Sequence, residues 1–342
     1  MRRECAKLSC VFVVLISFVF MPLSSLFADR TIPLKVSGVF GEYSPETGDY
    51  SNPGVGTPTG RVGNEGTVLL TPTNNPLVLE WVTDGFHVLT DDDGDQIFMS
   101  GGGSVELIPT GNMDGKNTEF TAEWGADFHI EGGNGKYEGI RPGNKPIAVS
   151  AVNDPFFLDE NFQPLAGDIW TFSSDLEGTF KTRNEFFDGA RKWKVKSGDG
   201  IVEAFPLPAG PPESFMFYGV GAPLGKYECP GEAVIDGVIG QIPTLTGADF
   251  SGTATFESRD GSILACTYDG IARLIPTDPK NPLLIKTRWE AEFKPIPTLC
   301  TGRFANVSDG SLMMTALTDP IEINAEDIPV SWSGSGYLQY DR

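Results

Sequence analysis

The sequence predicts an all-β protein that consists of two tandem antiparallel β-barrels with about eight strands each. The first observation is an internal repeat: Glu106–Thr110 recurs as Arg273–Thr277 and Asp93-Gly94 recurs as Asp260-Gly261, each 167 residues later. The second is composition, because 41 Gly and 26 Pro among 342 residues separate many short apolar runs. The third is the period of those runs, which is two residues, as in strands, with no sustained helical period of 3.6.

The repeat extends well beyond these two segments. Gly135-Lys136-Tyr137 recurs as Gly302-Arg303-Phe304 at the same offset, and Gly54-Val55-Gly56 recurs as Gly219-Val220-Gly221 at an offset of 165. A nearly constant offset over about 80 residues indicates two tandem copies of one domain. Each copy is an internal control for the other, since a feature found in only one copy is not required by the fold.

The clearest strand is Phe120–Ile130, in which every even-numbered residue is apolar and the odd-numbered ones are Thr, Glu, Gly, Asp and His. This alternation places one face in a core and the other in water. The same face in copy 2 carries Leu283, Ile285, Thr287, Trp289, Ala291 and Phe293. At the 167 offset Ala122 aligns with Trp289 and Trp124 with Ala291, which predicts a Trp/Ala exchange at nearly constant core volume.

An Asp-Gly dipeptide between two strand-like runs predicts a hairpin in each copy, at Asp93-Gly94 and at Asp260-Gly261. Gly supplies the positive φ that such a tight turn needs. Further short strands are predicted at Leu34–Val39, Leu77–Trp81, Ser104–Ile108, Ile147–Val152, Ile169–Phe180, Phe215–Val220, Ala233–Val238, Ile271–Ile275, Ser311–Ala316 and Pro329–Tyr340. Many short strands joined by hairpins are typical of sandwiches and closed barrels.

The domain boundaries follow from the repeat and from a change of composition. We place barrel copy 1 at 29–185 and barrel copy 2 at 214–342. The segment 186–213 between them is first basic and then rich in Pro, which is typical of a semi-rigid linker. Its basic part is interpreted as a solvated, partly strand-like connector, the alternatives being contact with the acidic barrels or with an anionic partner.

Residues 1–28 are predicted to be a secretory signal peptide. Arg2, Arg3 and Lys7 precede the apolar run Val11–Leu23, and small residues lead to a cleavage site after Ala28. The apolar run is short for a membrane span of about 20 residues. We therefore expect a secreted or periplasmic mature chain that starts near Asp29 and has no stable membrane span.

The charge of the chain argues against nucleic acid as a partner. The net charge is −21, and cleavage after Ala28 would remove three cationic side chains and one carboxylate, which leaves about −23. Phosphate binding is driven by Lys and Arg, which such a chain lacks in excess. Solubility outside the cytoplasm explains the acidity.

Three cysteines remain after the predicted cleavage, Cys229, Cys266 and Cys300, and all lie in copy 2. The copy 1 residue aligned with Cys266 is Met99, so the fold does not require a disulfide. An oxidising compartment permits one bridge, Cys266–Cys300 or Cys229–Cys300. Without a CxxC motif, the sequence predicts no zinc site.

The glycine-rich run Gly132–Gly139 is followed by Arg141-Pro142-Gly143 rather than by a helix, which predicts a tight turn instead of a phosphate loop. This run, the hairpin Gly94–Phe98 and the Gly-Arg and Gly-Lys turns at Gly60 and Gly225 resemble the allene oxide cyclase and dirigent-protein β-barrel family. The resemblance covers most of each copy and implies the barrel fold. It assigns no active-site residue to this chain.

Other chemistry is weakly indicated. The acidic run Asp91–Asp95 would put Leu89 at the first position of a calcium loop, where a carboxylate is needed, so a hairpin tip is predicted instead. His129 falls on the polar face of its strand, and His87 aligns with Ala254, so the fold does not require it. No Ser/His/Asp spacing indicates a hydrolase.

We interpret the protein as an exported, non-catalytic barrel protein that binds a small apolar ligand or has a structural role. Small barrels are filled by side chains or hold one ligand. The candidate aromatic wall is Trp124, Phe128, Trp289 and Phe293, which could equally be core residues. The alternative, an isomerase or cyclase that shapes a reactive intermediate, follows from the family resemblance. No cofactor is implied, and no oligomeric state is assigned.

Overall fold

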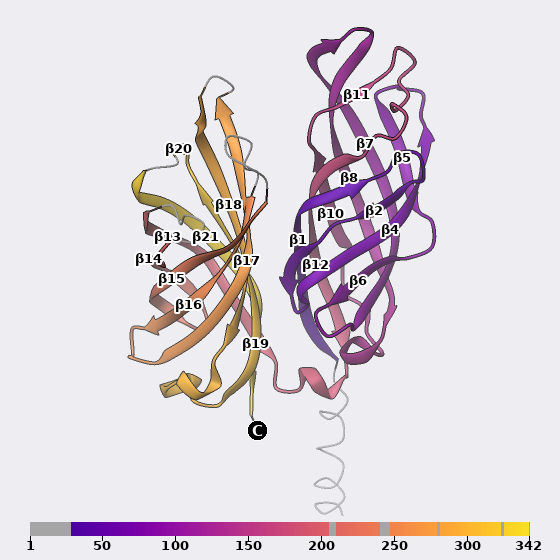
Figure 1. Cartoon of the computed structure of the whole chain (residues 1–342). Coiled ribbons are helices and arrows are strands. Elements are labelled where there is room, and N and C mark those ends of the chain that lie inside the picture. Colours follow the sequence, from indigo (N-terminus) through magenta and orange to yellow (C-terminus); the bar gives the residue numbers. More distant parts are fainter. Residues whose placement is uncertain (1–28, 205–209, 240–246, 279–280, 323–324, 342) are drawn as a thin grey trace, which may run out of the picture.

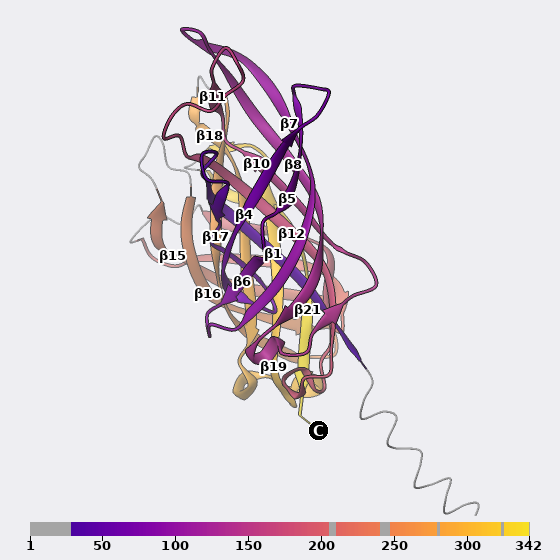
Figure 2. The same cartoon turned by 90° about the vertical axis from the view of Figure 1, so that its right-hand side faces the viewer.

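The computed structural model describes residues 29–341 except 205–209, 240–246, 279–280 and 323–324. The chain forms two antiparallel sheets that lie side by side (Figure 1), and each closes on itself. The turned view shows their strands tilted and coiled around each barrel (Figure 2). The predicted all-β fold with two tandem barrels is confirmed. The predicted signal peptide at 1–28 lies outside the described residues.

Barrel 1 contains the first twelve strands, and the β7–β8 pairing closes its sheet. Its strands are β1 (Arg30–Tyr43), β2 (Asp49–Ser51), β3 (Gly54–Thr57), β4 (Gly60–Pro72), β5 (Val78–Thr83), β6 (His87–Asp91), β7 (Gln96–Asp114), β8 (Asn117–Gly133), β9 (Arg141–Pro142), β10 (Ile147–Asn153), β11 (Phe156–Leu158) and β12 (Trp170–Thr182). Short 3₁₀ turns, η1 (Gly135–Tyr137) and η2 (Glu185–Phe187), lie at one end.

Barrel 2 closes through the β17–β18 pairing into a ring of eight strands. Its strands are β13 (Arg191–Ala204), β14 (Glu213–Ala222), β15 (Gly225–Ile239), β16 (Gly247–Ser258), β17 (Ile263–Asp278), β18 (Asn281–Pro295), β19 (Val307–Thr318), β20 (Ile321–Glu322) and β21 (Glu326–Tyr340). The 3₁₀ turns η3 (Pro297–Leu299) and η4 (Gly302–Phe304) follow β18, and η4 repeats η1.

The pairing order relates the barrels strand by strand. β13 takes the place of β1, β14 that of β2 and β3, β15 that of β4, and β16 that of β5 and β6. In the same order β17, β18, β19 and β21 correspond to β7, β8, β10 and β12. Barrel 1 therefore interrupts two strands that are continuous in barrel 2, at 52–53 and at 84–86.

The structure corrects the predicted linker at 186–213. β13 pairs with β14 on one side and with β21 on the other, so the basic part of that segment is a strand of barrel 2. Trp193 and Val195 are buried inside the barrel, and the exposed residues between and around them are Lys192, Lys194 and Lys196. The alternation of buried and exposed residues that is typical of a strand is hard to recognise in this segment, because lysines dominate its composition. Two of the four prolines at its end, Pro206 and Pro208, lie outside the described residues.

Strand register also corrects the predicted Trp/Ala exchange. Trp124 pairs with Val105 and Trp289 pairs with Ala272, and these two partners are equivalent at the 167 offset. The tryptophans therefore occupy the same place in their barrels. The hairpin between Val105 and Trp124 is two residues longer than the one between Ala272 and Trp289, so the offset is 165 at this place in β8 and is 167 again at η1.

The barrel interiors hold the two main hydrophobic cores. The even-numbered residues of β8 point inward as predicted, with Phe128 and Ile130 buried and His129 exposed. One end of barrel 1 is filled by aromatic rings, with the Phe187 ring centre 5.7 Å from that of Phe180 and 6.4 Å from that of Tyr137. The predicted glycine-rich turn forms η1, where Gly135 adopts a φ of +54°.

The barrels meet through strand β3, which packs against β17, β18 and β19. Val55 is fully buried in a small cluster with Ile271 and Met313. Gly54 and Gly56 flank Val55, and a side chain on Gly54 would collide with the backbone of β1. The Gly-Val-Gly motif thus gives barrel 1 a narrow apolar ridge that packs against the outer face of barrel 2.

Charged groups surround this ridge. The Arg61 guanidinium of barrel 1 contacts Asp249 at 3.1 Å and Asp269 at 3.3 Å in barrel 2. In the opposite direction Arg288 of barrel 2 donates to Asp175 at 2.6 Å. Arg288 also contacts the buried Glu290 at 2.6 Å. Positive side chains of each barrel thus meet carboxylates of the other. These ion pairs fix how the two barrels are positioned relative to each other around the buried Val55 cluster.

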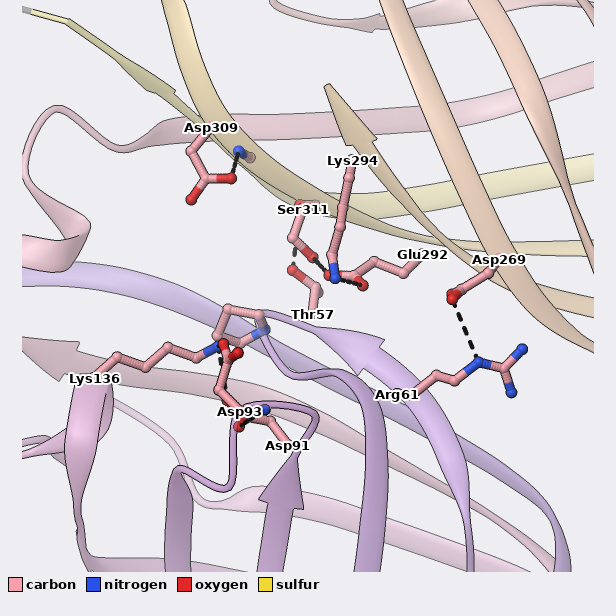
Figure 3. A network of polar contacts seen from close by, with 12 residues as sticks. Thr57, Arg61, Asp91, Asp93, Lys136, Asp269, Glu292, Lys294, Asp309 and Ser311 are labelled. Atoms are coloured by element: carbon pink, nitrogen blue, oxygen red, sulfur yellow. Dashed lines mark hydrogen bonds and ion pairs between the residues drawn. The ribbon is translucent and has the colours of Figure 1, made fainter. Parts of the chain in front are cut away.

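A second buried carboxylate, Glu292, lies at the centre of the polar contacts in Figure 3. It accepts a 2.6 Å hydrogen bond from Ser311, whose backbone carbonyl accepts one from Thr57 of barrel 1. Lys294 approaches Glu292 at 3.0 Å. Burial raises the pKa of Glu292 to about 6, although Lys294 and Ser311 oppose the shift and Asp269 adds to it.

This shift predicts that Glu292 makes folding less favourable as pH rises. The folded-state pKa lies above the ordinary value of 4.5, so between pH 4.5 and 6 the folded chain binds more protons than the unfolded chain. Its stability should therefore fall through that window, by about 2 kcal/mol for a shift of roughly 1.5 units. We expect Glu292→Gln to remove this loss, measured by urea denaturation at pH 4.5 and 7.

The matched control is Asp127→Asn. Asp127 occupies the equivalent place on β8, next to Phe128 as Glu292 is next to Phe293, but it is exposed. We expect this variant to retain the wild-type difference between the two pH values. If Glu292→Gln kept the wild-type difference in unfolding free energy between pH 4.5 and 7, the pH dependence could not be assigned to Glu292.

The three cysteines Cys229, Cys266 and Cys300 are free and buried, so neither of the two alternative bridges, Cys266–Cys300 or Cys229–Cys300, is formed in this structure. The Cys300 thiol instead lies 3.3 Å from the carbonyl oxygen of Ile296. Burial raises the pKa values of the three thiols, which keeps them protonated. In the described part of the chain we find no helix with the length and apolar character to cross a membrane.

Candidate functional site

Barrel 1 contains an internal cavity. It leaves about 60 Å³ for the centre of a water-sized molecule, where about 10–15 Å³ suffices for one water. Most of its wall is apolar, formed by Tyr43, Val68, Trp81, Trp124, Phe128, Val149, Ala151, Phe172 and Leu176. The cavity can therefore hold several waters or one small organic molecule.

Aromatic rings fix the shape of the cavity through edge-to-face contacts. The Trp124 ring lies 5.5 Å from Tyr43 and 5.9 Å from Trp81, centre to centre, both at 68°. Trp81 in turn meets Phe128 at 5.8 Å and 80°. Such pairs contribute beyond their buried area, so they stabilise the wall around the cavity. The Trp124 indole N–H also donates to the Asn153 side chain at 2.5 Å.

Two titratable side chains face each other in this apolar wall. The Tyr50 hydroxyl is hydrogen-bonded to Nδ1 of His87, and the His87 ring packs 4.6 Å from Phe128. β6 begins at His87, directly after the interruption at 84–86, and Tyr50 lies on the short strand β2. Gly66 makes room for the pair, because a side chain there would meet the Tyr50 hydroxyl.

Both members of the pair are neutral. Burial lowers the pKa of His87 to about 3 and raises the pKa of Tyr50 well above its ordinary value of 10. A tyrosine hydroxyl that donates to Nδ1 leaves the proton of the neutral imidazole on Nε2. The pair then presents a hydrogen-bond donor, Nε2–H, which has no partner among the described residues.

Further polar groups surround the pair. Asn64 lines the cavity, and its buried side-chain oxygen has no partner among the described residues. Asn52, at the interruption between β2 and β3, donates to Ser174 at 2.7 Å. Buried polar atoms without partners are rare in proteins, so the Asn64 oxygen on the cavity wall is available to a ligand or a water.

Barrel 2 also has a cavity, with about 40 Å³ on the same measure. Its wall is almost entirely apolar and comprises Val202, Phe215, Phe217, Ala233, Phe250, Tyr268, Trp289, Phe293, Met314, Ala316 and Val330. The Tyr268 hydroxyl is already bonded to the carbonyl of Glu232. Of these described wall residues none offers an unpartnered polar atom to a ligand.

Strand pairing shows what replaces each polar group of barrel 1. Phe215 stands in place of Tyr50, Ala254 in place of His87, and Cys229 in place of Asn64. The hydrogen-bonded Asn52 and Ser174 are replaced by Phe217 and Trp332, whose ring centres lie 5.3 Å apart. One barrel of the same fold is therefore stable without any of these polar groups. Their presence in barrel 1 calls for a reason other than folding.

The structure places all four predicted site residues on cavity walls, Trp124 and Phe128 in barrel 1, Trp289 and Phe293 in barrel 2. Sequence reasoning missed Tyr50, Asn64 and Asn153, and it left His87 without a role. The alignment of His87 with Ala254 was the available signal. Tyr50 and Asn52 lie at a strand interruption that the apolar pattern does not reveal.

The side chains that line the barrel 1 cavity are uncharged, and this limits the class of ligand that the cavity can bind. Its described lining residues include no Asp, Glu, Lys or Arg, and the described residues contain no cluster of three metal-ligating side chains. An ionic ligand would lose its hydration without a countercharge. The site is therefore suited to a neutral, largely apolar molecule with a hydrogen-bonding group.

No family model, curated protein or solved structure that we compared with this chain matches it.

Proposed function

We propose that this protein is an exported binding protein whose barrel 1 holds one small neutral molecule, largely apolar and aromatic in character. The observation that carries the proposal is the unequal polarity of the two cavities. Barrel 2 has the same fold and a smaller cavity whose described wall residues offer no unpartnered polar atom, whereas the cavity of barrel 1 is lined by buried polar atoms without partners. Concave, mostly apolar pockets with few convergent polar groups are the usual form of small-molecule sites.

The polar groups indicate what the ligand offers. His87 supplies a donor through Nε2–H and Asn64 an acceptor through its side-chain oxygen. A hydroxyl group can accept from the first and donate to the second. A phenol-like molecule combines such a hydroxyl with a ring that can stack on Trp81, Trp124 or Phe128. The charge of the chain has no part in this recognition, because the cavity wall is neutral.

We expect phenol to bind wild-type protein and to raise its melting temperature, since a ligand that binds only the folded state stabilises it. Ala151→Leu should abolish this shift, because Ala151 lines the cavity beside Trp124 on the neighbouring strand, and a larger side chain there fills the space. Thermal shift and isothermal titration calorimetry with phenol, indole and toluene are the measurements. Toluene, without a hydroxyl, should bind more weakly than phenol.

The matched control is Ala316→Leu. Ala316 pairs with Trp289 in barrel 2 as Ala151 pairs with Trp124 in barrel 1, so both variants place the same larger side chain beside the equivalent tryptophan. We expect Ala316→Leu to keep phenol binding. If both variants lose binding equally, or if no probe binds the wild type, the site is not the barrel 1 cavity.

A second candidate, an isomerase or cyclase, is favoured by one observation, the Tyr50–His87 pair. A neutral imidazole N–H held by a tyrosine can polarise a substrate oxygen in a dry cavity. A binding protein should return its ligand unchanged. An isomerase should return a product that His87→Ala does not form, and mass spectrometry combined with chromatography of the recovered molecule distinguishes the two.

A further inference from the structure

The two barrels carry the same docking motif, but only one of them uses it. Gly54-Val55-Gly56 of β3 is buried between the barrels, with Val55 0% exposed against Ile271 and Met313. The repeat Gly219-Val220-Gly221 lies at the equivalent place in β14, where Val220 is 48% exposed. The fold alone does not require an apolar ridge that points into solvent.

The surface around Val220 repeats other features of the docked face. A groove of about 770 Å³ runs over β13–β16 and is lined in part by Tyr218, Val220, Lys226 and Arg259. Lys226 follows the turn after β14 as Arg61 follows the turn after β3, and Arg61 is the residue that bonds to Asp249 of barrel 2. Tyr218, which is 48% exposed, stands where barrel 1 has Pro53.

The receiving face is also duplicated. Barrel 2 receives β3 on the outer side of β17, β18 and β19. The equivalent strands β7, β8 and β10 of barrel 1 expose Ser104, Gly125 and Ala148 where barrel 2 has Ile271, Glu290 and Met313. These smaller residues leave room for a larger side chain such as Tyr218. Exposed Glu80 of β5 stands in place of Asp249, the carboxylate partner of Arg61.

We propose that the Val220 face of barrel 2 docks onto the β7–β8–β10 face of barrel 1 in a second copy of this chain. Lys226 then pairs with Glu80 of the second copy, as Arg61 pairs with Asp249 within one chain. The contact uses two different faces, so each added copy leaves one of each kind free, and the assembly grows head to tail or closes into a ring. Because every chain carries a net charge of −21, salt that screens this repulsion should favour association.

Sedimentation velocity and light scattering of the mature chain over a wide concentration range test the proposal. We expect the mass to rise above that of a monomer with concentration and with added salt. Val220→Glu should keep the protein monomeric, and so should Ala148→Glu on the receiving face. The matched control is Ile201→Glu, because Ile201 is 47% exposed on the neighbouring strand but lies outside the groove. It should associate like the wild type.

Mixing the two interface variants gives the sharpest readout. Val220→Glu retains an intact receiving face and Ala148→Glu retains an intact docking face, so the mixture should form heterodimers that grow no further. Circular dichroism and melting of each variant separate loss of docking from loss of folding. A wild type that stays monomeric, a Val220→Glu variant that associates normally, or a mixture of folded variants that stays monomeric would overturn the proposal.

Discussion

Trp289→Ala should lower the free energy of unfolding by about 3–5 kcal/mol, the usual cost of truncating a buried aromatic residue. The indole lies 5.0 Å from the Phe250 ring at 85° and donates to Thr287 at 2.7 Å. Its cross-strand neighbours, Ala272 and Ala316, are too small to fill the space that it would leave. Urea denaturation followed by circular dichroism measures the loss.

Trp124→Ala is the matched comparison, because Trp124 holds the equivalent position in barrel 1. Trp124 is only partly buried, whereas Trp289 is buried, so its truncation should cost less stability than that of Trp289. It should instead weaken phenol binding, which Trp289→Ala should leave intact. A loss below about 1 kcal/mol for Trp289→Ala would fall in the range of surface substitutions and would contradict the core assignment.

Barrel 1 should lose stability in mild acid because of His87. Its folded-state pKa is about 3, whereas an unfolded histidine has a pKa of about 6.5. Between these values the unfolded chain binds a proton that the folded chain excludes, so stability is complete above pH 6.5 and falls as pH decreases. The expected slope approaches about 1.4 kcal/mol per pH unit, or about 3 kcal/mol between pH 6.5 and 4.

The test compares the pH dependence of unfolding in wild type, His87→Ala and His129→Ala. Barrel 2 carries alanine at the position of His87, so His87→Ala introduces a residue that this fold already accepts. We expect it to remove the loss of stability between pH 6.5 and 5, while the opposite contribution of Glu292 in this window remains. His129 is exposed, so His129→Ala should retain the wild-type slope. If the free energy of unfolding depended on pH equally in all three proteins, His87 would bind a proton as easily in the folded as in the unfolded chain. That result would contradict its burial.

Glu292 acts in the opposite direction over part of the same range. Its contribution makes the folded state more stable as pH falls from 6 to 4.5, whereas that of His87 makes it less stable. The two groups lie in different places, His87 inside barrel 1 and Glu292 at the interface between barrels. The His87 variant therefore reports the pH dependence of stability inside barrel 1. The Glu292 variant reports that of the contact between the two barrels.

The sequence by itself determined the all-β class, the duplication and the inward-facing residues, because an alternation of two residues and a repeated hairpin signal are local properties of the chain. It predicted Trp124, Phe128, Trp289 and Phe293 as interior residues, which the structure confirms. It predicted a turn for Gly132–Gly139 and an exposed His129, which the structure also confirms. Their use in ligand binding stays a prediction.

Only the tertiary structure decided the register, the first strand of barrel 2 and the location of the polar site. The Trp124–Trp289 equivalence depends on hairpin length, which shifts the offset from 167 to 165, and β13 is recognisable only by its partners β14 and β21. Tyr50 and His87 lie 37 residues apart and come together because barrel closure brings interrupted strands to one cavity. Whether Val55 or Val220 is buried likewise depends on a neighbouring barrel, since identical Gly-Val-Gly segments carry no local signal of what covers them.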